Sequence, residues 1–211
     1  SGQILPSLIV DNGGLSGTNT LLSSRDTGSG LSLTISGGAI LRPESSTTMT
    51  MASLTVATNS TFLGPGGGAL NLILTGFAMV EAGGNISADG QGYAGGSGSS
   101  GGAGLTASGG SGGGGHAGFG GRGLGNAPVA GPGTGGNAYD LLSNPTLAGS
   151  GGGGVNFSGG SGGGLIQITA NGPFTLNGRI SANGVNATTN NAGGGAGGTT
   201  TLTDTQLPLR G

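Results

Sequence analysis

The chain contains one histidine, His116, and seven carboxylates, and these are the residue types that acid–base or nucleophilic catalysis would need. A His–carboxylate or Ser–His–Asp arrangement would have to be built on His116, while a glycosidase would need two facing carboxylates at a controlled separation. His116 lies among glycines, which supply few side chains to hold it in place. The carboxylates are scattered along the chain: Asp11, Asp26, Glu44, Glu81, Asp89, Asp140 and Asp204. We therefore expect an exposed or locally hydrogen-bonded imidazole at His116 and no catalytic residues.

The absence of lysine and cysteine narrows the chemistry further. Without them the chain forms no Schiff base, disulfide, cysteine zinc site or lysine-containing phosphate loop. A formal net charge of −2 with 6% charged residues gives no basic surface for nucleic acid or for a membrane. No apolar run reaches the length of about 18 residues that a transmembrane helix needs. We expect no cofactor, no metal, no nucleic-acid partner and no membrane insertion.

A few large side chains stand out in the glycine-rich middle of the chain. Aromatic residues and arginine dominate binding hot spots, so they could stack on sugar rings or on a partner surface. Alternatively, they anchor the glycine tract to the rest of the fold, which is the interpretation we favour. These candidate binding residues are Tyr93, His116, Phe119, Arg122 and Tyr139.

Four Asn-x-Ser/Thr sequons permit glycosylation if the chain is extracellular. A chain this rich in asparagine, serine and threonine is expected to contain about that number by chance. The candidate asparagines are Asn59, Asn85, Asn156 and Asn186.

The segment from Gly90 to Gly164 carries 33 of the 57 glycines. It has almost no side chains to bury, so its backbone must be held mainly by backbone hydrogen bonds. Two ordered forms are open to it. It could continue a solenoid as thin, glycine-lined strands, or it could form packed extended polyglycine segments, in which missing Cβ atoms let backbones approach closely.

Outside this segment the sequence alternates in the manner of β-strands. Residues 31–36, 48–51 and 53–56 alternate apolar and polar side chains and are bounded by Gly, Asn and Ser. No ten-residue segment has a helical apolar face, so helix content should be close to nil.

A repeat is the strongest architectural signal. Residues 70–74 lead to Ile86-Ser87-Ala88-Asp89-Gly90, and residues 166–170 lead to Ile180-Ser181-Ala182-Asn183-Gly184. Because Asp89 and Asn183 occupy equivalent places, we assign Asp89 a turn role. Short, alternating, turn-punctuated copies suit stacked rungs of about 20–25 residues. We predict a parallel β-helix (β-solenoid) with an ordered glycine-rich insertion, and an antiparallel β-sandwich is the alternative.

The predicted organisation has three parts. Residues 1–89 form β-solenoid rungs with an extended N-terminal segment that caps the fold or pairs with a neighbour. Residues 90–164 are the insertion, and residues 165–211 continue the rungs. Since the chain begins at Ser1 and not at Met, either a leader has been removed or the chain is part of a longer product.

Several glycine-rich motifs carry a family resemblance. They are residues 115–123, 137–140, 144–145 and 149–154, followed by Gly-Gly-Gly-Leu-Ile-Gln-Ile and Ile-Ser-Ala-Asn-Gly. With these motifs, residues 66–203 resemble glycine-rich repeats of very large secreted or surface proteins of bacteria and microbial eukaryotes. The resemblance implies a β-helical fold with a structural or adhesive role and supplies no catalytic residues. On composition alone, the chain is also similar to glycine-rich phage tail-fibre adhesins.

Three functions are therefore considered. The first is a non-enzymatic extracellular structural protein whose solenoids assemble end to end into a surface fibre, filament or matrix through backbone pairing. The second is an adhesin that presents the glycine tract to glycans or to a cell-surface receptor. The third is a polysaccharide-active β-helix enzyme, which would depend on His116 and Asp140.

Overall fold

The computed structural model describes residues 6–15, 17–99, 103–106, 109–124, 132–154 and 158–205. Within them the protein is all-β, and its only helical element is one 3-10 turn, η1 (Ser24–Asp26). The strands are β1 (Ser7–Asp11), β2 (Asn19–Leu22), β3 (Ser32–Ser36), β4 (Ile40–Pro43), β5 (Thr48–Met51), β6 (Ser53–Val56), β7 (Thr61–Leu63), β8 (Ala69–Leu74), β9 (Ala78–Val80), β10 (Asn85–Ser87), β11 (Leu165–Ala170), β12 (Phe174–Leu176), β13 (Arg179–Ser181) and β14 (Thr199–Asp204).

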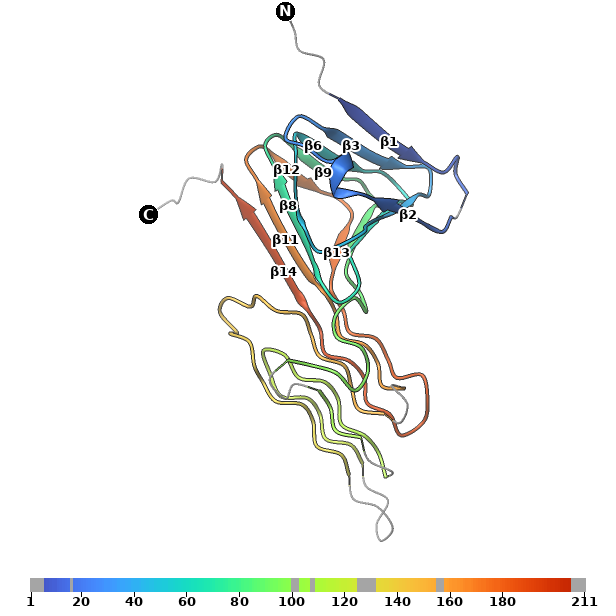
Figure 1. Ribbon diagram of the computed structural model, residues 1–211, viewed down its shortest axis with the longest axis vertical. Coiled ribbons are helices and arrows are strands. Elements are labelled where there is room, and N and C mark those ends of the chain that lie inside the picture. Colours follow the sequence, from blue (N-terminus) through green and yellow to red (C-terminus); the bar gives the residue numbers. More distant parts are fainter. Residues whose placement is uncertain are drawn as a thin grey trace, which may run out of the picture.

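The strands form three sheets, and the chain visits the sheets in turn (Figure 1). Sheet A has the order β1-β3-β6-β9-β12, sheet B has the order β2-β4-β7-β10-β13, and sheet C has the order β5-β8-β11-β14. We call one pass through A, B and C a circuit; η1 takes the place of the sheet C strand in the first of the five circuits. Every described strand pair is parallel, so the alternative of an antiparallel β-sandwich is wrong.

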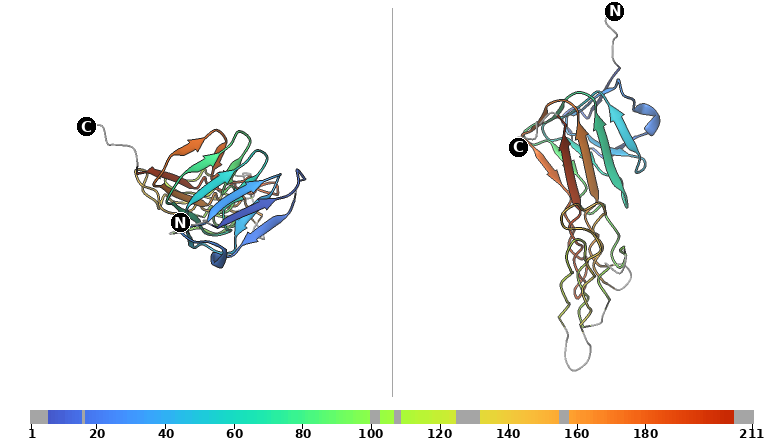
Figure 2. Two further views of the ribbon diagram at one scale, coloured as in Figure 1. Left: turned by 90° about the horizontal axis from the view of Figure 1, so that it is seen from above. Right: turned by 90° about the vertical axis from the view of Figure 1, so that its left-hand side faces the viewer.

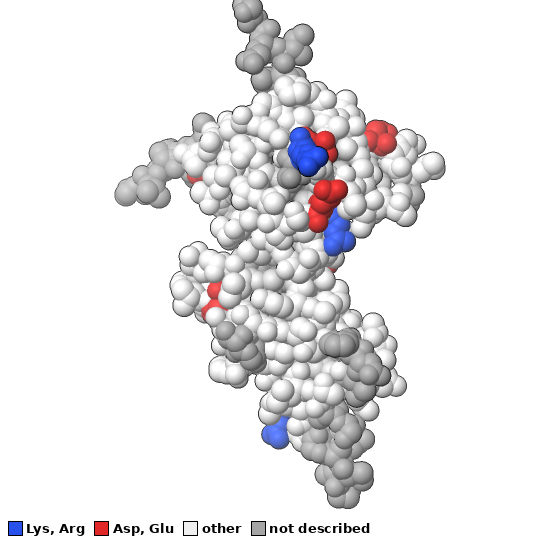
Figure 3. Space-filling view, in the orientation of Figure 1, with Lys and Arg blue, Asp and Glu red and all other residues white. Residues whose placement is uncertain are grey.

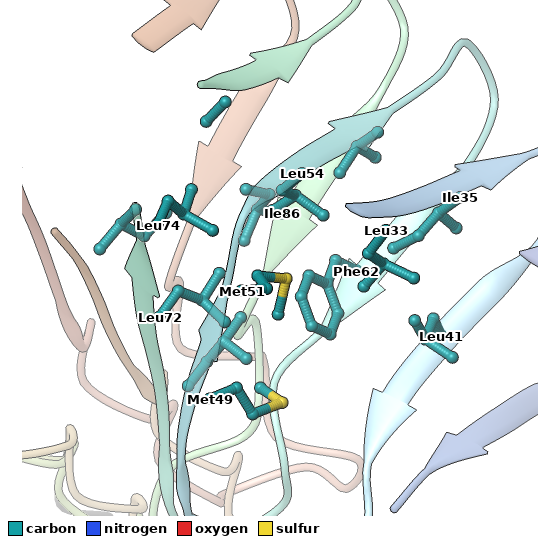
Figure 4. Packing of buried hydrophobic residues seen from close by; sticks show 14 of the residues in the cluster. Leu33, Ile35, Leu41, Met49, Met51, Leu54, Phe62, Leu72, Leu74 and Ile86 are labelled. Atoms are coloured by element: carbon teal, nitrogen blue, oxygen red, sulfur yellow. The ribbon is translucent and has the colours of Figure 1, made fainter. Parts of the chain in front are cut away.

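The circuits are aligned so that equivalent residues stack on one another. In sheet A the register joins Val10, Ile35, Val56, Val80 and Leu176 in one column. Its three middle members are fully buried, because a strand points alternate side chains to one face. Sheets B and C add similar columns, and the buried side chains of the three sheets form one hydrophobic cluster (Figure 4).

The corner between sheets A and B uses left-handed backbone in four successive circuits. The residues with positive φ there are Gly13 and Gly14, Gly37 and Gly38, Asn59, and Gly83. Glycine and asparagine tolerate this conformation best, which explains the glycine and asparagine punctuation that bounds the strands in the sequence.

The glycine-rich segments project from the sheets along the direction of the sheet C strands (Figure 1). We call this projection the glycine bundle. It extends from one corner of the stack and leaves the outermost strands at both ends of the stack uncovered (Figure 2). No helix in the described part of the chain is long and apolar enough to cross a membrane.

Candidate functional site

The glycine bundle grows out of the corner between sheets B and C in the last two circuits. The chain leaves this corner after β10 and after β13, and it returns immediately before β11 and before β14. Strand pairing continues across the boundary, since the amide of Gly90 donates to the carbonyl of Asn183 and that of Gly163 donates to Ala196. The bundle is therefore a direct extension of sheets B and C.

Within the bundle, successive amides of one segment bind different neighbours. In residues 149–153, Gly149 and Gly152 donate to residues 163 and 160 of one segment. Ser150 and Gly153 donate to residues 115 and 112 of a second segment, and Gly151 donates to residue 97 of a third. Each neighbour is met every third residue, which is the period of a polyproline II helix. Of the two ordered forms considered for the tract, the structure has packed extended polyglycine segments.

Glycine is a steric requirement inside this packing. A Cβ atom at Gly152 would lie 2.0 Å from the carbonyl oxygen of Gly193, and one at Gly160 would lie 1.9 Å from that of Val185. A neighbouring carbonyl occupies the place where a side chain would begin, so close that an L side chain would push the segments apart. Glycine has the same role at the axis of collagen, where the absence of a side chain lets the backbones approach closely.

One cluster of side chains joins the bundle to sheet C, and we call it the His116 cluster: His116, Tyr139, Asp140, Ser150 and Thr199. His116 Nε2 lies 3.0 Å from Asp140 Oδ2 and 3.5 Å from Thr199 Oγ1, the first residue of β14. His116 is buried, and its ring centroid lies 5.6 Å from that of Tyr139. The cluster therefore links two bundle segments to the start of a strand.

The geometry of this cluster differs from that of a catalytic triad. In a triad the carboxylate and the hydroxyl bind opposite nitrogens of the imidazole, so that one nitrogen takes the proton of the hydroxyl while the carboxylate orients the ring and stabilises its positive charge. Here Asp140 and Thr199 both contact Nε2. The Thr199 hydroxyl also donates to the carbonyl of Leu147 at 3.1 Å and is buried. The arrangement holds three segments together.

Asp140 organises the loop that follows it. Its Oδ2 accepts the amides of Thr146 and Leu147 at 2.9 and 2.8 Å, and its Oδ1 accepts the amide of Leu141 at 2.9 Å. Burial of the carboxylate acts to raise its pKa, but these amide hydrogen bonds and the contact with His116 outweigh burial and hold the pKa below its ordinary value. Asp140 is thus an ionised, structural carboxylate.

Tyr139 contributes a second polar link. Its hydroxyl donates to the carbonyl of Ala148 and accepts from Ser150 Oγ at 3.0 Å. Burial raises the pKa of the Tyr139 phenol, while the Ser150 hydrogen bond opposes this shift. Ser150 is fully buried and is the only residue with a side chain between Gly149 and Gly154, a signal in the sequence that would have pointed to it.

The structure separates the five candidate binding residues. His116 and Tyr139 lie together in the His116 cluster. Tyr93 lines a pocket of about 170 Å³ at the junction with sheet C, beside Leu147 and Leu165. Phe119 is 80% exposed, and Arg122, three residues further along the chain, is also exposed. Thr199 and Ser150 were not predicted as part of the site.

The candidate glycosylation positions lie on the surface where they are described. Asn59 and Asn186 are exposed, while Asn85 is partly buried on the outer face of sheet B. Asn156 lies outside the described residues.

Charged side chains are sparse over the visible face of the molecule and gather mainly over the sheets (Figure 3). Among the described residues no group of three or more His, Asp or Glu side chains could hold a metal ion. Comparisons of the chain with family models, with curated proteins and with solved structures give no match.

Proposed function

We propose that the chain forms a β-solenoid and serves as a non-enzymatic structural subunit of an extracellular fibre or surface matrix, assembled end to end. The observation that carries this proposal is the pair of open ends of the three parallel sheets. At one end β1, β2 and β5 are the outermost strands, and at the other end β12, β13 and β14 are outermost. Outermost strands present unpaired backbone donors and acceptors, which are templates for another chain.

The partly buried apolar residues support the same proposal. The core contains fully buried side chains in its middle circuits, but Leu8 and Val10 at one end and Phe174, Ile180 and Ala182 at the other are only partly buried. Covering these side chains with another solenoid would continue the core and remove apolar surface from water. Because the two ends differ, such contacts are head to tail and do not close.

The His116 cluster supports a structural role over an enzymatic one. Its carboxylate, its hydroxyls and Nε2 of its imidazole bind each other or backbone groups. Asp140 and Thr199 both contact Nε2, whereas the carboxylate of a triad orients the ring through the opposite nitrogen. The extracellular location rests on the resemblance to glycine-rich repeats of secreted and surface proteins.

Electron microscopy of the purified chain at high concentration tests this proposal. We expect filaments, and only monodisperse monomers would contradict it. Val10→Lys places a charge in the open end of the core and should abolish filaments. The matched control is Ile9→Lys on the outer face of the same strand, where the side chain is 64% exposed, and it should leave them intact. Thermal unfolding of both variants separates lost assembly from lost folding.

A second candidate function is adhesion through the side of the bundle. Phe119 and Leu124 are 80% and 87% exposed on one glycine segment, and Arg122 lies between them. Aromatic residues and arginine on a rigid support are typical of binding hot spots. Phe119→Ala with Arg122→Ala should abolish attachment to glycan-coated or cell surfaces while the fold persists, and unchanged attachment would exclude this function.

A further inference from the structure

The end of the stack formed by β1 and β2 contains a cavity that opens into the hydrophobic interior. The cavity has a volume of about 440 Å³, and its lining is apolar apart from Thr20 and Asp26. The apolar lining residues are Leu8, Val10, Leu21, Leu22, Leu31 and Leu41. Sheet C has no strand in this first circuit, because the chain forms η1 there. The inward-facing side chains of β1 and β2 are therefore in place, but no sheet C strand covers them.

The opposite end of the stack presents apolar side chains that match this cavity. Phe174 and Leu176 on β12 occupy the inner positions of sheet A, and Ile180 on β13 occupies the inner position of sheet B. Phe174 and Ile180 are only partly buried, and Leu176 is 45% exposed. Phe174 follows Ala78 in its column, so a large side chain stands above a small one at this end.

We propose that Phe174 of one copy enters the cavity of the next copy, with β12 pairing in parallel with β1 in the register that the internal circuits already use. This inference rests on the proposed end-to-end assembly and specifies its join. Continuing the two inner columns of sheet A places Phe174 over Leu8 and Leu176 over Val10. The same register brings Thr175 of one copy beside Ile9 of the next.

Sheet B continues in the same way across the join. Its inner column runs Thr20, Leu41, Phe62, Ile86 and Ile180, so Ile180 of one copy comes over Thr20 of the next. Sheet C does not continue directly, because β14 meets η1 and not a strand. The join therefore depends on sheets A and B. On the sheet C side, the contact between two copies differs from the contact between two circuits of one copy, because η1 stands there in place of a strand.

A disulfide test suits this chain because it contains no cysteine. Paired parallel strands lie about 4.8 Å apart, within the Cα separation of about 4.4–6.8 Å that a disulfide allows. Ile9 and Thr175 are both exposed, so cysteines there should leave each copy folded. We expect oxidised Ile9→Cys/Thr175→Cys protein to give a covalent ladder on a non-reducing gel, while either single variant gives none.

The matched control is Ile9→Cys/Thr203→Cys, in which the second cysteine lies at the same end of the stack but on sheet C. It should give no ladder. Two results would overturn this join while leaving end-to-end assembly intact. One is filaments that give no covalent ladder with Ile9→Cys/Thr175→Cys, and the other is an equal ladder from the control variant. Absence of filaments in the unmodified chain would overturn both.

Truncation of the aromatic side chain gives an independent measurement. Phe174→Ala should raise the critical concentration for assembly by about tenfold or more, since it removes a buried aromatic anchor at the centre of the join. Thr175→Ala, on the outer face of the same strand, should leave the critical concentration unchanged. An unchanged critical concentration for Phe174→Ala in a variant that remains folded by circular dichroism would overturn the role of Phe174.

Discussion

Gly197 and Gly198 are consecutive residues of one extended segment, yet a neighbouring backbone occupies the place of a side chain at Gly198 and not at Gly197. A Cβ atom at Gly198 would lie 1.9 Å from the carbonyl oxygen of Gly164, whereas at Gly197 the nearest atom, the carbonyl oxygen of Ala182, would be 4.0 Å away. Neither residue has a positive φ. Close packing therefore requires glycine at position 198, whereas position 197 has room for a side chain.

Alanine at these two positions should change the free energy of unfolding in opposite directions. Gly197→Ala should raise it by about 0.4–1 kcal/mol, because it reduces the entropy of the unfolded chain without strain. Gly198→Ala should lower it by about 1–3 kcal/mol or more, because neighbouring backbones must separate. Urea unfolding monitors both, and equal effects of the two changes would contradict the close packing of the bundle.

Loss of the Tyr139 hydroxyl should destabilise the chain. Tyr139→Phe leaves the buried Ser150 hydroxyl and the carbonyl of Ala148 without a partner. Leaving a buried polar group unsatisfied costs about 1–3 kcal/mol, which urea unfolding measures. Tyr139→Phe/Ser150→Ala removes both hydroxyls, and it should recover part of the loss; a double variant less stable than Tyr139→Phe would argue against this link.

Asp140 should make stability depend on acidity. The folded-state pKa of Asp140 lies below the unfolded value of about 3.9, so its contribution is fully present above that value. The contribution is lost as the pH falls through the folded-state pKa. Asp140→Asn should lower the free energy of unfolding at pH 7 by about 1–3 kcal/mol, and its difference from the wild type should shrink in acid.

Unfolding curves collected at decreasing pH check this behaviour. Glu44→Gln changes an exposed carboxyl and should reproduce the wild-type curve. A constant difference between Asp140→Asn and the wild type at every pH would show that Asp140 acts without its charge.

Two phenylalanines provide a test of where the core lies. Phe62 is fully buried between Leu41 and Ile86 in sheet B, whereas Phe119 is 80% exposed on the bundle. Phe62→Ala should cost about 3–5 kcal/mol through lost burial and a cavity. Phe119→Ala should change stability by no more than about 0.5 kcal/mol. Thermal melts compare them, and a large effect at Phe119 would mean that the bundle buries this ring.

The strands could be predicted because their side chains report their orientation. Thr48-Met49-Thr50-Met51 alternates with period two, and both methionines are buried in β5. The parallel arrangement was expected from the recurrence of residues 70–74 at residues 166–170, and these segments pair directly in sheet C. In the strands, an apolar or polar side chain indicates whether that position faces the core or the solvent.

The packing of the bundle could not be predicted for the opposite reason. Its contacts join backbone groups, which are the same at every glycine, so the sequence does not distinguish one neighbour from another. Residues 193–198 illustrate this, because they read as the lead-in to a strand but also bind the segments around residues 112, 153 and 160. The contact between His116 and Thr199, 83 residues apart, likewise follows from the packing and from no local motif.

The position of residues 192–198 sets an order for folding during synthesis. The bundle is encoded mostly before residue 165, but these late residues exchange hydrogen bonds with three of its earlier segments. During synthesis, those backbone groups of the earlier segments that pair with residues 192–198 have no such partner until these residues have left the ribosome. Contacts between distant parts of a chain slow folding. We therefore expect completion of the bundle and addition of β14 to be one late event, at the same end of the stack that we propose joins the next copy.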